Sequence, residues 1–85
     1  MSIDLMFQQA NAAYRAGDFA GAERRYRALT RLKPSWAFHN LGALYVATQR
    51  FAEAEAAFQQ ALAADPANAD SRHSLGMLLM GDGRY

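Results

Sequence analysis

The chain has 85 residues, of which 52% are hydrophobic and 20% charged, and a formal net charge of +1. This length and balance suit one small folded domain and argue against disorder. The near-neutral charge gives no strong attraction to nucleic acid or to an anionic membrane. The absence of cysteine excludes disulfides, thiolate metal sites and cysteine nucleophiles.

The first ten residues contain no basic region followed by an apolar core, so we do not expect them to be a signal peptide. No apolar run approaches the ~20 residues that span a bilayer. We therefore expect a cytoplasmic protein with no membrane or nucleic-acid partner. Eight arginines against one lysine are typical of a GC-rich bacterial gene, so we also expect a bacterial origin.

Apolar residues at helical spacing, in an alanine-rich chain, predict five helices separated by short turns. Ser35 and Asn68 are predicted N-caps, and the small residues Gly42 and Gly76, with Ala22 and Ala54, are expected where helices approach closely. The predicted helices are Ile3–Ala16, Phe19–Leu32, Ser35–Thr48, Phe51–Ala64 and Ala69–Asp82.

Two segments of the sequence repeat each other. In each, an aromatic residue is followed by Ala after three residues, an aromatic after four more and Pro after eight more. Leu41-Gly42 also recurs as Leu75-Gly76, and Gly17-Asp18-Phe19 as Gly83-Arg84-Tyr85. The repeating sets are Phe19, Ala22, Tyr26 and Pro34, and Phe51, Ala54, Phe58 and Pro66.

This pattern resembles the tetratricopeptide repeat (TPR) family, whose 34-residue unit reads W-x₂-L-G-x₂-Y…A-x₃-F…P. The resemblance implies an all-α, right-handed superhelical stack of antiparallel helix pairs, with repeats at about 3–34 and 35–68 and the first helix of a third at about 69–82. The first repeat departs from the pattern, since two residues are missing just after Pro34. The matching positions of the middle repeat are Phe38, Leu41, Gly42, Tyr45, Ala54, Phe58, Ala61 and Pro66.

In this family the first helix of each pair lines a concave groove that binds peptides, so the resemblance implies a protein or peptide partner. An asparagine amide can donate to and accept from a peptide backbone, which favours Asn11 and Asn40. Trp36, Phe7 and Tyr14 are either anchors for the partner or packing between repeats. The predicted groove residues are Phe7, Gln8, Asn11, Tyr14, Arg15, Trp36, His39, Asn40, His73, Ser74 and Met77, with Ala43, Ala47 and Asp70 beside them.

More specific family functions match less well. Gln8, Asn40 and Ser74 partly resemble the asparagine ladder of the repeats that precede some glycosyltransferases. The clamp that binds the acidic C-termini of heat-shock chaperones needs three basic residues, and Phe7, Asp70 and Ser74 stand there instead. We therefore do not expect that partner.

Other candidate sites have simpler explanations. His39 and His73 share a repeat position, but catalytic zinc usually needs three protein ligands, so we expect no metal and no cofactor. The basic residues of the second helix suit a solvated convex face better than a nucleic-acid interface. No GxSxG elbow or Gly-rich phosphate loop occurs, so we expect no enzyme. These basic residues are Arg24, Arg25, Arg27, Arg31 and Lys33.

The fifth helix is apolar nearly all round, whereas a terminal helix of a repeat stack usually has a polar outer face. We predict a self-association face here, or a continuation of the chain; alternatively, Met77 and Met80 simply tolerate solvent. The predicted face is Leu75, Leu78, Leu79 and Met80.

The sequence thus favours a protein-interaction scaffold. The alternative is an N-terminal repeat segment of a larger bacterial enzyme, for example a glycosyltransferase, which presents substrates or mediates dimerisation. The two differ in whether a catalytic domain follows Tyr85.

Overall fold

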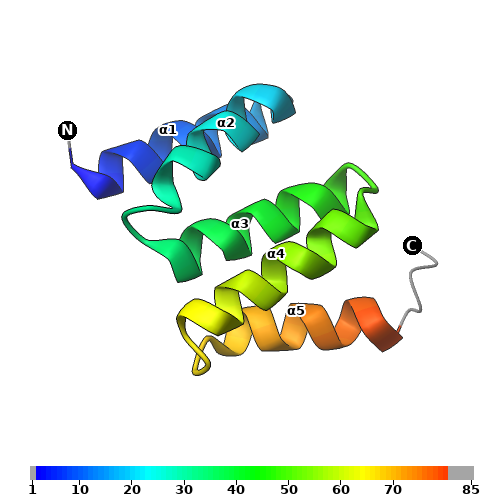
Figure 1. Cartoon of the computed structure of the whole chain (residues 1–85). Coiled ribbons are helices and arrows are strands. Elements are labelled where there is room, and N and C mark those ends of the chain that lie inside the picture. The colour runs from blue at the N-terminus through cyan, green and yellow to red at the C-terminus, as the bar shows by residue number, and fades with distance from the viewer. Residues whose placement is uncertain (1, 81–85) are drawn as a thin grey trace.

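A computed structural model describes residues 2–80, which form five α-helices and no strand (Figure 1). Successive helices run antiparallel and each packs mainly against its neighbours in the chain. The all-α helical repeat expected from the sequence is therefore confirmed. The helices are α1 (Ile3–Arg15), α2 (Phe19–Leu29), α3 (Pro34–Ala47), α4 (Phe51–Ala64) and α5 (Ala69–Met80).

The turns within the two helix pairs have the same geometry. Gly17 after α1 and Gln49 after α3 align in the repeat, and both adopt a left-handed backbone, with φ of 84° and 61°. The N–H of the next residue, Asp18 or Arg50, donates to a carbonyl five residues back, at 2.9 and 2.7 Å. This is the Schellman arrangement, which satisfies the last carbonyls of a helix.

Of the two N-caps predicted at the repeat boundaries, Asn68 is confirmed and Ser35 is wrong. Asn68 caps α5, since its Oδ1 accepts from the N–H of Ser71 at 3.0 Å. Ser35 is wrong as a cap because α3 begins one residue earlier, at Pro34, where the fixed φ of proline favours the first helical position. The Ser35 hydroxyl instead accepts a hydrogen bond from Asn68 Nδ2 at 2.7 Å, which links the two boundaries.

Helix α2 ends at Leu29, not at Leu32 as predicted. The residues missing after Pro34 explain the difference. Because α3 starts at Pro34 itself, whereas α5 starts three residues after Pro66, the chain must reverse direction before Pro34. The residues that would form the last turn of α2 make this reversal instead. Helix α2 therefore has 11 residues, whereas its counterpart α4 has 14. The predicted end of the fifth helix, Asp82, lies outside the described residues.

The closest helix approach lies between α3 and α4. A Cβ atom built on Gly42 would lie 2.5 Å from ring carbon Cε1 of Phe58, whose side chain is only 1% exposed. Ala22 and Ala54 are fully buried, as their predicted packing role requires. Gly76 differs, because nothing described lies within 4 Å of an added Cβ.

A hydrogen-bonded ion network joins the first helix pair to the second. The Glu23 carboxylate accepts from the Tyr45 hydroxyl at 2.8 Å and from the guanidinium groups of Arg27 and Arg50, each at 2.9 Å. Arg50 also binds Glu53 at 2.7 Å. The hydrogen bond from Arg50 is the main cause that lowers the pKa of Glu23 from 4.5 to about 2, against burial, which raises it.

We predict opposite effects of the same substitution at two glycines. Gly42→Ala should lower the free energy of unfolding by about 1–3 kcal/mol, because the methyl group meets a buried ring. Gly76→Ala should raise it by up to about 1 kcal/mol, because alanine favours helix and the space is open. Urea unfolding followed by circular dichroism measures both. A Gly42→Ala variant with the wild-type free energy of unfolding would contradict the close approach of α3 and α4.

The Glu23 network predicts an acid-labile stabilisation. Because the folded pKa lies below the unfolded one, the contribution is present above about pH 4.5 and is lost toward about pH 2. After discounting for solvent screening, we expect wild-type protein to lose on the order of 1–2 kcal/mol more than Glu23→Gln across this window. Glu55→Gln, on α4 outside this network, is the control and should behave as wild type. Parallel pH profiles of wild type and Glu23→Gln would refute the effect.

Candidate functional site

The predicted groove contains a polar pocket between α3 and the start of α5. It encloses about 230 Å³, and its walls come from two elements that the Asn68 cap holds together. Indole, imidazole, amide and carboxylate groups thus face one space. The lining residues are Trp36, His39, Asn40, Asn68 and Asp70.

His39 is fixed in this pocket from two sides. Its Nδ1 lies 3.0 Å from the hydroxyl of Ser71, which is fully buried, and its ring lies 5.7 Å from that of Phe58. Burial lowers the pKa of His39 below 6.5, and the Asp70 carboxylate opposes this in part. His39 is therefore a neutral, oriented polar group at pH 7.

Trp36 is both packed and exposed. Its ring meets the edge of Phe7 with centroids 6.1 Å apart, and the Lys33 ammonium lies 5.6 Å from its centroid. Nevertheless, 60% of the residue is exposed. Packing between repeats and anchoring a partner are thus not exclusive roles for Trp36, since a ring held from one side can present its remaining surface to a partner.

A second pocket, of about 330 Å³, continues the groove toward the end of α5. It is mostly apolar, and the buried ring of Phe58 forms part of it. Three predicted groove residues, His73, Ser74 and Met77, lie here together with Ala43. The remaining lining residues are Val46, Phe58 and Leu78.

The predicted residues of α1 are mostly used in packing. Phe7 is buried, and Tyr14 meets the ring of Phe19 edge-on at 5.5 Å. Asn11 Oδ1 accepts a hydrogen bond from the Tyr26 hydroxyl, so this oxygen already has a partner within the helix pair. Gln8 and Arg15 are exposed. The structure therefore brings together the predicted residues of α3 and α5, and gives Phe7, Asn11 and Tyr14 structural contacts.

Two residues that form or support the polar pocket, Asn68 and Ser71, are not among the predicted site residues. Asn68 was assigned only a capping role, yet it also lines the pocket. Ser71 orients His39 from the buried side. The available signal was that Ser71 occupies the repeat position of Ala37, which is also fully buried. A polar residue at a buried position needs a partner, and His39 is that partner.

The two histidines lie at different pockets. Within residues 2–80, no group of three or more His, Cys, Asp or Glu side chains could hold a metal ion.

Two of the four residues of the predicted self-association face of α5 pack inward. Leu78 is 4% exposed and belongs to the core, and Leu75 packs against that core. Leu79 and Met80 are exposed by 53% and 84%, and Met77 by 54%. Self-association through α5 would therefore rest on Met77, Leu79 and Met80.

Comparison with known proteins identifies the repeat. Two sequence models described as tetratricopeptide repeat match the chain, one over residues 7–44 and the other over residues 35–68. No curated protein matches the chain at a significant level. Among the described residues, no helix has the length and apolar character needed to cross a membrane.

We predict that the His39 imidazole titrates below its usual pKa of 6.5, and that Asp70→Asn lowers its pKa further. The substitution removes the carboxylate that favours the charged imidazolium. Proton NMR titration measures both values, with His73→Gln used to assign the signals. An unchanged or higher pKa of His39 in Asp70→Asn would contradict the electrostatic role of Asp70.

Proposed function

Since the chain belongs to the tetratricopeptide repeat family, we propose that it binds a peptide segment of a partner protein in the groove between α3 and α5. Repeats of this family generally mediate protein–protein interaction. The observation that supports this groove is that a polar pocket and an apolar one follow each other along α3 and α5, beside an exposed tryptophan.

Each part of the groove supplies what peptide binding requires. The Asn40 amide offers a donor and an acceptor to a peptide backbone. Trp36 offers a large apolar surface whose orientation is already restricted by Phe7, so little conformational entropy is lost on binding. The pocket beside Met77 can bury one apolar side chain of the peptide.

This proposal predicts that Asn40→Ala weakens peptide binding on the order of tenfold, the loss expected from about one or two hydrogen bonds. The ligands are peptides selected on the wild-type chain from a phage library of random short sequences. Calorimetry measures affinity, and the emission of the single tryptophan, Trp36, reports on the groove. Binding should change this emission.

Gln59→Ala is the matched control, because Gln59 is an exposed amide on α4 outside the groove. It should leave affinity unchanged, and both variants should unfold as wild type does. If no selected peptide lost affinity for Asn40→Ala or changed the Trp36 emission, the proposed site would be refuted.

A further inference from the structure

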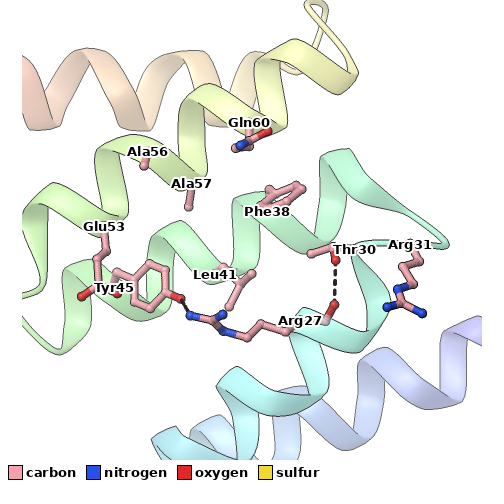
Figure 2. A pocket seen from close by; sticks show the side chains of 10 residues that line it. All are labelled: Arg27, Thr30, Arg31, Phe38, Leu41, Tyr45, Glu53, Ala56, Ala57 and Gln60. Carbon is pink, nitrogen blue, oxygen red and sulfur yellow. Dashed lines mark hydrogen bonds between the residues drawn. The ribbon is translucent and has the colours of Figure 1, made fainter.

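A larger pocket lies on the other side of α3, away from the groove. It forms a trough of about 490 Å³ between α2 and α4, with α3 as its floor (Figure 2). The floor residues are Phe38, Leu41 and Tyr45. At about 3.6 residues per helical turn, this stripe lies about half a turn from Trp36 and Asn40. The α2–α4 trough and the groove are therefore separate sites on opposite faces of one helix.

The early end of α2 and the small residues of α4 leave this trough unfilled. Where a longer α2 would have continued, the wall is the turn that contains Thr30 and Arg31. The Thr30 hydroxyl holds this turn by donating to the Arg27 carbonyl at 2.6 Å. On the facing wall, between Glu53 and Gln60, Ala56 and Ala57 present only methyl groups. The resulting volume falls within the ~300–1,000 Å³ of typical ligand pockets.

The two ends of the trough differ in charge. Arg27 and Glu53 lie at the end near Tyr45 (Figure 2). Arg27 is paired with Glu23, and Glu53 with Arg50, so these charges are neutralised. At the other end, Arg31 is exposed and makes no ion pair with any described residue. From Phe19 to Lys33 the chain carries five basic residues and one acidic residue. An occupant with a carboxylate near Arg31 would complement this excess.

We propose that the α2–α4 trough docks a second segment of a partner protein, one in which an apolar side chain is accompanied by an acidic one. The apolar side chain lies on Phe38 between the alanines of α4 and the turn after α2. The acidic side chain pairs with Arg31, and the exposed amide of Gln60, on the trough wall, holds the backbone of the segment. The apolar floor favours such a segment over a nucleic-acid backbone, which would gain only the charge.

The test uses a phage library of random short peptides, selected on the wild-type chain and depleted on Ala56→Leu. Leucine at this exposed position fills the trough without entering the core. Peptides that survive should combine an apolar residue with Asp or Glu a few positions away. Their affinity should fall on the order of tenfold in Ala56→Leu and in Arg31→Glu, as measured by calorimetry.

Each variant has a control on the same helix or in the same basic region. Ala52→Leu adds the same side chain to an exposed position of α4 outside the trough, and Arg24→Glu makes the same change of charge on α2. Both should retain wild-type affinity, and circular dichroism should confirm that all four variants fold. Asn40→Ala should also bind these peptides normally, which separates this site from the groove.

Four outcomes would overturn the proposal. Depletion on Ala56→Leu could leave no enriched peptide. The enriched peptides could lack acidic residues. Arg24→Glu could weaken binding as much as Arg31→Glu, or a single-stranded oligothymidine could displace the peptides, which would mean that only the general positive charge of α2 attracts them.

Discussion

The ring of Phe58 occupies the space that the missing side chain of Gly42 leaves open, and much of the molecule is arranged around this contact. It holds α3 and α4 together at their closest approach. On the groove side, the same ring supports His39, which in turn contacts Ser71 at the start of α5. Phe58 also forms part of the apolar pocket. One aromatic side chain thus sets the helix spacing, orients a polar residue of the groove and contributes apolar surface to it.

Helix α3 consequently lines a pocket on each of its two faces. Its polar and small residues line the groove with α5, and its apolar stripe is the floor of the trough between α2 and α4. Contacts with both neighbours hold α3 in place, since Gly42 packs against Phe58 of α4 and the Tyr45 hydroxyl donates to Glu23 of α2. A helix in a stack need not bury every apolar side chain completely to be stable.

The repeat and its spacing were enough to predict five helices and the Gly42 contact, because both follow from local periodicity and the size of side chains. The sequence could not predict how the residues missing after Pro34 are accommodated. Either a strained turn or a shorter α2 would have satisfied the pattern, and only packing decides between them. Nor could it predict that Leu78 is buried and Leu79 exposed, since a helix that is apolar all round has no periodic signal to fix its rotation.

The sequence also could not predict that the amide oxygen of Asn11 is already hydrogen-bonded. This depends on whether the Tyr26 hydroxyl reaches it across the helix pair. Its engagement leaves the groove with Asn40 on α3 and Asp70 on α5, and with no cation among the residues that line the polar pocket. The trough on the opposite face is bordered by Arg31, which has no ion-pair partner within residues 2–80, and by the basic surface of α2. The two faces of α3 therefore differ in the sign of their charge. A segment whose acidic residues are attracted to the trough gains no electrostatic attraction in the groove. This difference would let a partner dock two chemically distinct segments in a fixed order on one small domain.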